Sequence, residues 1–292
     1  MLSALYLRTD LAVENPNLHT HHSGISISQQ EENEVTILTV DVQTDDAARH
    51  IMRPVGRYIT LSFAPFWSGY ESIDASAIQT VLSHNLKTLL SRQQTPKRVL
   101  VIGLGNRAIT ADAVGPLAVE QIDVTGHFEN NPVLKPYLPP CSTFALSPGV
   151  VGKTGIETLS IIQAAVKSCS ADLAIAIDSL AARSTERLGC SIQLSNTGII
   201  PGSGIGNHRK AIDQSTLGIP VIAIGVPLVV SSATLICDAL ETSGIESISQ
   251  ELTEILENRK SFFVTLKESD LATALLAKLI ANSVNTVIAS LT

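Results

Sequence analysis

The sequence predicts an α/β fold built on a mainly parallel sheet with helices on both faces. Strand-like apolar runs alternate with helical periodicities from residue 98 onward, which is the pattern of βαβ units. Hydrophobic residues make up 45% of the 292 residues and aromatic residues only 4%, so the core must consist of Ile, Val, Leu and Ala, as in buried parallel strands. This length suits one α/β domain with appended elements.

The first part of the chain predicts an irregular start, two strands and a helix. Residues 1–34 are polar, and we expect them to be irregular. Residues 35–42 alternate between apolar and polar side chains, and residues 58–63 also favour a strand. Residues 74–92 carry apolar side chains at helical spacing, which predicts a helix.

The rest of the chain predicts the α/β core. Residues 98–103 and 172–177 are continuous apolar runs that favour buried strands. Further strands are expected at 189–194 and 219–225, and helices at 112–122, 155–168, 231–240, 248–257 and 270–290. Right-handed crossovers would place such helices on both faces of the sheet.

Composition and charge exclude several classes of function. The 20 basic and 27 acidic residues give a net charge of −7 without a basic cluster, which predicts no direct binding of nucleic acid. The four cysteines form no CxxC pair and favour reduced thiols in a cytoplasmic protein. Residues 1–14 do not resemble a signal peptide, and the apolar runs at 219–230 and 271–291 are broken or amphipathic, so we expect no membrane span.

Asp112 is the first candidate site residue. It follows the strand and glycine turn of VLVIGLGNRAITADAVGP, residues 99–116, where the spacing does not match the dinucleotide fingerprint GxGxxG. Asp112 lies near the expected start of a helix. An acid in that position is typical of a helix cap as well as of a site at the carboxyl end of a strand.

Asp178 is the second candidate, at the end of the apolar run in LAIAIDSLAAR, residues 173–183. A buried carboxylate is costly unless it is paired or functional. The alternative is a cap for a helical turn over residues 179–183. If the two strands are neighbours, Asp112 and Asp178 open onto one crevice and share a proton, which is the chemistry of an aspartic protease. The same pair could instead hold a divalent metal, with His127 or His208 as a further ligand.

Two glycine-rich segments could supply backbone N–H donors to a ligand. These are TGIIPGSGIGN, residues 197–207, and PGVVGKTGIET, residues 148–158. The first lacks the GK[ST] ending of a P-loop, and the chain has no GxSxG elbow, so nucleotide hydrolysis and serine catalysis are disfavoured.

Taken together, the motifs resemble the germination protease family of endospore-forming bacteria. GLGN-x₅-DAVGP, VT-x-H, PGVVGKTGIET, AIDSLAAR, TGIIPGSGIGN and LGIPVIAIGVP occur in the family's order between about residues 8 and 230. The resemblance implies an atypical aspartic endopeptidase that degrades small acid-soluble spore proteins in the spore core. It implies a homotetramer without a cofactor or a metal. The implied fold is similar to that of the hydrogenase maturation peptidases, a phosphorylase/hydrolase-like architecture. The family's two essential acids correspond to Asp112 and Asp178.

The resemblance also implies a zymogen that cleaves itself. The family cuts after an acidic residue that precedes a hydrophobic residue and Ala, and this chain offers Asp10-Leu11-Ala12. We therefore expect residues 1–10 to be a propeptide and residues 11–292 to be a single α/β peptidase domain with C-terminal helices. The chain departs mildly from the family pattern at Ala111, Val114 and Ser179.

Supporting roles follow from position in the sequence. Asn106 could orient Asp112, and Lys153 or Arg183 could recognise the acidic side chain before the cut. Gly202, Gly204 and the segment 149–155 could donate backbone N–H groups to the oxyanion. Two alternatives remain open, namely a metal-dependent peptidase similar to the hydrogenase maturation enzymes and a non-catalytic peptide-binding module.

Overall fold

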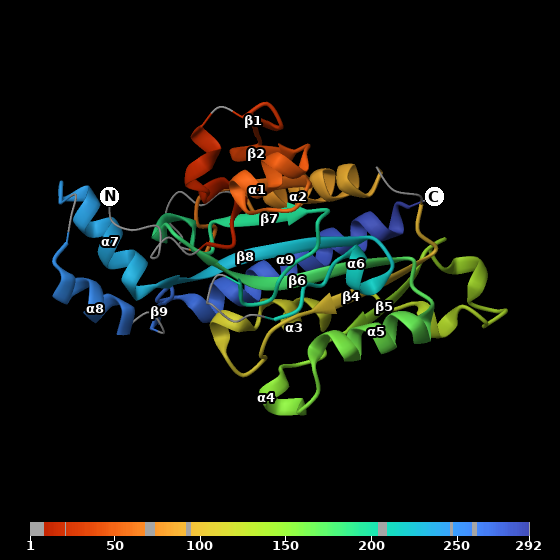
Figure 1. The fold of residues 1–292 in the computed structure, drawn as a ribbon. Coiled ribbons are helices and arrows are strands. Elements are labelled where there is room, and N and C mark those ends of the chain that lie inside the picture. The colour runs from red at the N-terminus through yellow and green to blue at the C-terminus, as the bar shows by residue number, and fades with distance from the viewer. Residues whose placement is uncertain are drawn as a thin grey trace.

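One mixed sheet organises the protein (Figure 1). The computed structural model describes residues 9–20, 22–67, 74–91, 95–203, 209–245, 248–258 and 262–291. The strands within these residues are β1 (Ile25–Glu32), β2 (Val35–Val42), β3 (Gly56–Ser62), β4 (Arg98–Gly103), β5 (Ser142–Leu146), β6 (Leu173–Ala182), β7 (Ser191–Ser195), β8 (Val221–Ser231) and β9 (Phe263–Val264). Their order is β1-β2-β3-β7-β8-β6-β4-β5, and β9 pairs with β8.

Helices cover both faces of this sheet, which confirms the predicted α/β class, but the sheet is mixed and not mainly parallel as predicted. The helices are α1 (Asp45–Ile51), α2 (Ala75–Leu90), α3 (Val114–Val119), α4 (Val151–Thr154), α5 (Thr158–Cys169), α6 (Gln214–Leu217), α7 (Ser232–Thr242), α8 (Gln250–Asn258) and α9 (Ser269–Ala289). Parallel pairing is confined to β5, β4, β6 and β8, and the other pairs are antiparallel. The sheet contains both kinds of pairing because β1, β2 and β3 form an antiparallel meander that joins the parallel strands through β7.

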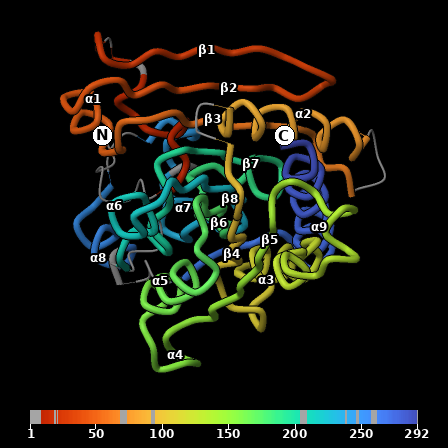
Figure 2. Tube along the Cα trace, turned by 90° about the vertical axis from the view of Figure 1, so that its right-hand side faces the viewer, coloured from red at the N-terminus to blue at the C-terminus, as the bar shows by residue number. Residues whose placement is uncertain are grey.

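Strand alternation divides the core into two layers. Along β4, Val99 and Val101 pack toward α2, α3 and α9, whereas Leu100 and Ile102 pack toward α5. Figure 2 shows α2 and α9 side by side on one side of the sheet, with α5 on the other. By length and apolar composition α9 would be long enough to cross a membrane, but 61% of its most apolar stretch is buried within the protein.

Several elements differ from the sequence-based expectations. The segment expected to be irregular contains β1, whose side chains are almost all exposed, so it carries no apolar alternation. Its hairpin to β2 turns at Asn33 and Glu34, both with positive φ, as in the turns that match strand twist. The strand β5 was not predicted. The expected helix at 112–122 is the short α3, which follows the 3₁₀ turn η4 (Thr110–Asp112).

The strand β6 continues beyond its predicted end. It pairs with β8 as far as Ala182, because the small and apolar residues after Asp178 are buried against a long neighbouring strand. Asp178 therefore lies within a strand. The alternative in which it caps a helical turn over residues 179–183 is wrong.

Candidate active site

Asp112 is fixed by the tight turn that follows β4. Gly105 has φ +112°, and a Cβ at this position would lie 2.1 Å from the carbonyl oxygen of Asp112, so the turn requires glycine. The backbone N–H of Asn106 donates to Asp112 Oδ2 at 2.8 Å. Asn106 thus orients Asp112 through its main chain, while its own side-chain oxygen accepts from the N–H of Ala108 at 3.1 Å.

A close backbone contact places Asp112 near the middle of β6. A Cβ at Gly115, in the first turn of α3, would lie 2.4 Å from the Leu104 carbonyl oxygen and 2.5 Å from that of Ile177. The N–H of Leu104 donates to the Ile177 carbonyl at 2.8 Å. Because Ile177 immediately precedes Asp178, the start of α3 and both acids lie close together beyond the carboxyl end of β4.

Asp178 is a buried acid in the middle of a strand, with 4% of its surface exposed. Its Oδ1 accepts from the N–H of Ser179 at 2.9 Å. Burial raises the pKa of Asp178 well above its usual range, and the nearby charges of Asp112 and Asp10 raise it further. Burial also raises the pKa of Asp112, but the Asn106 N–H and the Arg209 charge act in the opposite direction. A backbone N–H and the Arg209 charge act on Asp178 in the same way, but Asp178 is the more deeply buried acid, so a single proton on the pair is favoured on Asp178 and the charge on Asp112.

Both acids line one cavity of about 400 Å³. The cavity lies at the carboxyl end of β4, where ligands bind in parallel sheets, and beside residues 178–181 in the second half of β6. Its wall consists of Asp10, Gly105, Ile109, Ala111, Asp112, Asp178, Ser179, Leu180, Ala181, Pro201, Gly202, Arg209, Val229, Phe263 and Thr265. The wall therefore combines three acids with one arginine, and sequence reasoning had not identified that arginine.

The other predicted supporting residues have different placements. Gly202 lines the cavity, and Gly204 lies outside the described residues. Lys153 is exposed on α4, and the Arg183 guanidinium pairs with Glu241 at 3.1 Å, so neither cation is part of the cavity wall. The glycines of segment 149–155 also lie outside that wall.

Asp10, the acidic residue of the predicted self-cleavage segment, lines this cavity. The N–H of Asp10 donates to the carbonyl of Ala181 at 2.9 Å, and the N–H of Ala181 donates to Asp10 Oδ2 at 2.8 Å. The hydroxyl of Ser203 donates to Asp10 Oδ1. A main-chain N–H and a hydroxyl therefore hold the acidic side chain, in place of the cation expected from the sequence.

The residues after Asp10 are also docked. Leu11 is fully buried among Leu180, Ala182, Leu188 and Val230. Ala12 is fully buried beneath the β2–β3 layer.

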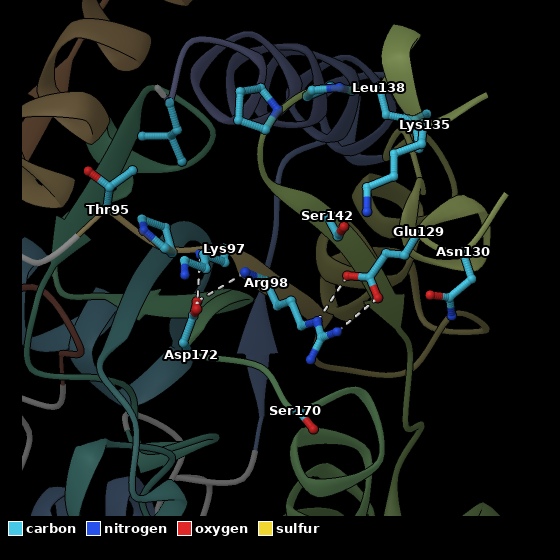
Figure 3. A pocket seen from close by; sticks show the side chains of 14 residues that line it. Thr95, Lys97, Arg98, Glu129, Asn130, Lys135, Leu138, Ser142, Ser170 and Asp172 are labelled. Carbon is cyan, nitrogen blue, oxygen red and sulfur yellow. Dashed lines mark hydrogen bonds and ion pairs between the residues drawn. The ribbon is translucent and has the colours of Figure 1, made fainter. Parts of the chain in front are cut away.

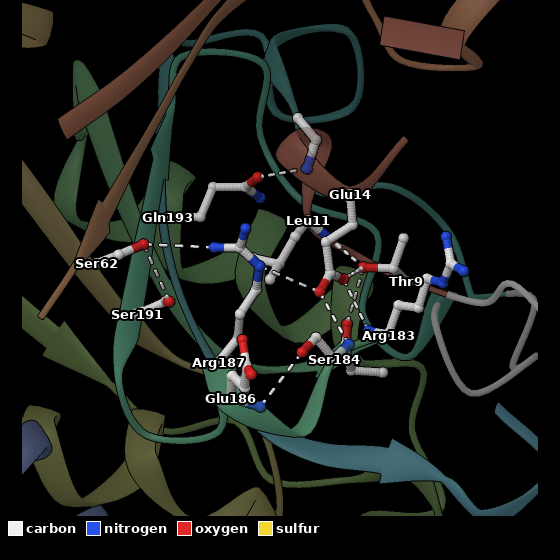
Figure 4. Close-up of polar contacts among 12 residues, drawn as sticks. Thr9, Leu11, Glu14, Ser62, Arg183, Ser184, Glu186, Arg187, Ser191 and Gln193 are labelled. Carbon is white, nitrogen blue, oxygen red and sulfur yellow. Dashed lines mark hydrogen bonds and ion pairs between the residues drawn. The ribbon is translucent and has the colours of Figure 1, made fainter. Parts of the chain in front are cut away.

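Glu14 anchors the end of this segment (Figure 4). Its side chain is 5% exposed and forms an ion pair with Arg187 at 3.3 Å. Its carboxylate also accepts from the N–H groups of Arg183 at 2.7 Å and Ser184 at 3.0 Å. These contacts fix the chain beyond the predicted cleavage point.

A larger cavity of about 770 Å³ lies at the opposite ends of the parallel strands (Figure 3). There Arg98 donates to both carboxylate oxygens of Glu129 at 2.9 and 3.1 Å. Asp172 accepts from the backbone N–H groups of Lys97 and Arg98. Arg98 and Glu129 are thus paired, and Asp172 is held by backbone N–H groups. This cavity lies at the amino ends of the strands and contains no acid pair, so it is not the candidate active site.

The described residues around the acid pair do not complete a transition-metal site. The cavity wall contains no histidine or cysteine among the described residues, and Arg209 already brings positive charge to both acids. His127 lies outside the wall with its ring tilted by 44° against that of Phe128, and His208 lies outside the described residues. In the part of the chain that the structure describes, no group of three or more His, Cys, Asp or Glu residues could hold a metal ion.

Comparisons with known proteins cover nearly the whole chain. A family model described as germination protease matches residues 7–265. A germination protease of Clostridium perfringens SM101 is 36% identical in an alignment 310 positions long, which covers 96% of this chain and 94% of the relative. One from Bacillus pumilus is 43% identical over 255 residues, which span 82% of this chain and 68% of the relative. Among solved structures, the [NiFe] hydrogenase maturation protease HycI from Thermococcus kodakarensis matches 68% of this chain and 97% of its own, with 15% identity and a TM-score of 0.36.

Proposed function

Because the chain belongs to the germination protease family and is therefore a peptidase, we propose that it is an aspartic-type endopeptidase that first cleaves its own Asp10–Leu11 bond. One observation carries the proposal. Asp10, the acidic residue of the segment that matches the family's cleavage preference, lines the same cavity as Asp112 and Asp178. A chance polar terminus would not need a fully buried Leu11 and a carboxylate held by two donors.

The two acids differ in a way that suits hydrolysis. Asp112, favoured as the ionised member, takes a proton from water as the water oxygen attacks the carbonyl carbon of Asp10. Asp178, favoured as the protonated member, gives its proton to the nitrogen of Leu11 as the C–N bond breaks. The products are a carboxyl group on Asp10 and a free amino group on Leu11. Residues 1–10 are released as the propeptide.

The docked segment supports a substrate class. The acidic side chain has two donors, the next side chain enters an apolar pocket, and the third position is a fully enclosed alanine. We propose that proteins with an acidic–hydrophobic–Ala sequence are cut in trans at the same site. The small acid-soluble spore proteins of the spore core are the substrates proposed on the basis of the family resemblance. A homotetramer in the spore cytoplasm is part of the same proposal.

Conservative substitution of the acids tests the proposal. Asp112→Asn and Asp178→Asn keep the side-chain shape and remove the proton exchange. The purified full-length chain is incubated, and the N-terminus of its products is sequenced. We expect new chains that start at Leu11 from the wild type and from Asp123→Asn, an exposed control, but not from the two variants.

Three outcomes would contradict this function. Wild-type cleavage in either variant would reject the acid pair. A wild-type chain that never starts at Leu11, yet binds a peptide of residues 7–16, would favour the non-catalytic binding module. Loss of cleavage with a chelator and its recovery with one metal would favour the metal-dependent alternative.

A further inference from the structure

Gln193 shares a row of the sheet with Asp178. Asp178 on β6 pairs with Gly225 on β8, and Gln193 on β7 pairs with the same Gly225. Residues paired across neighbouring strands present their side chains on the same face of a sheet. Asp178 and Gln193 therefore lie on one face, separated by a residue without a side chain.

Gly225 leaves room for the Leu180 side chain between Asp178 and Gln193. A Cβ at Gly225 would lie 2.3 Å from Leu180 Cδ1, so the glycine lets Leu180 lie over the row. Leu180 in turn forms part of the pocket that buries Leu11. The cleavage segment therefore lies on the face that carries Asp178 and Gln193.

The Gln193 amide holds the main chain on both sides of the Asp10–Leu11 bond. Its Nε2 donates to the carbonyl oxygen of Asp10 at 3.2 Å, and its Oε1 accepts from the N–H of Ala12 at 2.7 Å. Figure 4 shows Gln193 beside Leu11. The Asp10 carbonyl is the group that water attacks in the proposed reaction.

We propose that Gln193 is a further catalytic residue, whose amide N–H stabilises the oxyanion that forms on the Asp10 carbonyl oxygen. This inference rests on the proposed function. As water adds to the carbonyl carbon, negative charge develops on the oxygen that already accepts from Nε2, and the hydrogen bond becomes stronger. No proton leaves Gln193, and the charge disappears when the C–N bond to Leu11 breaks. The contact from Oε1 to the Ala12 N–H keeps the bond in place during the reaction.

These contacts apply to substrates as well as to the chain itself. Both partners of Gln193 are main-chain groups, so any peptide that docks like residues 9–14 would meet the same amide. Selectivity then comes from other contacts, namely the Ala181 N–H and the Ser203 hydroxyl at the acidic side chain. The structure assigns catalysis to Gln193 and side-chain recognition to these two donors.

Gln193→Glu separates the two functions of the amide. The substituted side chain has nearly the same shape and keeps an oxygen for the Ala12 N–H, but its ionised form cannot donate to the Asp10 carbonyl. Gln193→Leu removes both contacts at similar volume. Gln163→Leu is the matched control, because Gln163 is exposed and donates to the Thr216 carbonyl at 2.8 Å, away from the cavity.

The readout is the first-order rate at which the full-length chain gains the Leu11 N-terminus, measured from pH 3 to pH 8. At neutral pH we expect Gln193→Glu to be about 100- to 1,000-fold slower than the wild type, as for the loss of one oxyanion donor. Relative to the wild type, its rate should rise as pH falls below about 4.3, where an ordinary Glu becomes protonated and can donate. Gln193→Leu should stay slow at every pH, and Gln163→Leu should match the wild type.

A wild-type rate for Gln193→Glu at neutral pH would overturn the inference. Equal losses in Gln193→Glu and Gln193→Leu, without recovery at low pH, would show that Gln193 only holds the segment in place and would also overturn it. Circular dichroism and thermal melting confirm that each variant is folded. The Asn variants of Asp112 and Asp178 distinguish the two hypotheses. If these variants still cleave themselves, the proposed function fails. If only Gln193→Glu cleaves itself at the normal rate, the proposed function stands and the role of Gln193 as oxyanion donor is rejected.

Discussion

Asp10 and Ala181 form a reciprocal pair in which the main chain and the side chain of one residue bind the main chain of the other. The Asp10 N–H donates to the Ala181 carbonyl, and the Ala181 N–H donates to the Asp10 carboxylate. This pair joins the predicted cleavage segment to β6 only three residues beyond Asp178. The acidic residue before the cut is thus hydrogen-bonded to the strand that carries Asp178.

Asp10→Ala should slow self-cleavage by removing both bonds to the carboxylate. One hydrogen bond to a charged group contributes about 1.5–3 kcal/mol, so the loss of even one of the two corresponds to roughly a 10- to 100-fold lower rate. The measurement is the time course of the Leu11 N-terminus in the full-length chain. Asp123→Ala serves as an exposed control, and a wild-type rate for Asp10→Ala would contradict the recognition of an acidic residue.

Ala12→Leu should slow self-cleavage because the pocket has no space for a larger side chain. Ala12 is fully buried against Val40, Val42 and Tyr58, and overfilling a packed site costs about 1–3 kcal/mol. Residues 10–14 would have to move out of their docked position to relieve this strain. Val13→Leu is the matched comparison, since Val13 is only half-buried. Equal processing rates in the two variants would argue against an enclosed alanine site.

The sequence predicts the acid pair because each acid breaks an apolar pattern. Asp178 interrupts an otherwise buried strand, and Asp112 follows a glycine turn at a strand end, so strand-end reasoning brings both to one crevice. The sequence does not show that β6 continues past Asp178. That continuation depends on pairing with β8, which is a tertiary effect.

The remaining parts of the site carry no comparable signal. A glutamine in the strand SIQLS has the pattern of a solvent-facing position, and only the row through Gly225 places it near the cleavage segment. The sequence favoured Lys153 or Arg183 as partner of the acidic side chain, because a cation is the usual partner of a carboxylate. The structure uses the Ala181 N–H and the Ser203 hydroxyl. Backbone donors are available at every residue, so their use depends on the fold alone.

Gly115→Ala should destabilise the protein and misplace Asp112. The added methyl group would meet the carbonyl oxygens of Leu104 and Ile177 at 2.4 and 2.5 Å, and these main-chain atoms cannot move away as a flexible side chain can. We expect a loss of about 1–3 kcal/mol in the free energy of unfolding, measured by urea denaturation, together with slower self-cleavage. Gly152→Ala is the matched control, because an added Cβ there meets nothing within 4 Å. An equal effect of the two substitutions would contradict the close contact between α3 and β6.

Asp178→Asn should alter how stability depends on pH. An unfolded Asp loses its proton near pH 4, whereas burial and the neighbouring acids keep the folded Asp178 protonated to higher pH. Folding above about pH 4 therefore takes up a proton, and the wild-type free energy of unfolding falls as pH rises from the unfolded toward the folded pKa of Asp178.

The asparagine variant lacks this titration. We therefore expect it to gain stability relative to the wild type as pH rises from about 4 to 8. Urea denaturation across this range measures the difference, with Asp123→Asn as the exposed control. Parallel curves for Asp178→Asn and the wild type would mean that Asp178 is ionised in the folded protein. In that case Asp178 would carry no proton to give to the Leu11 nitrogen, and the proposed reaction would fail at this step.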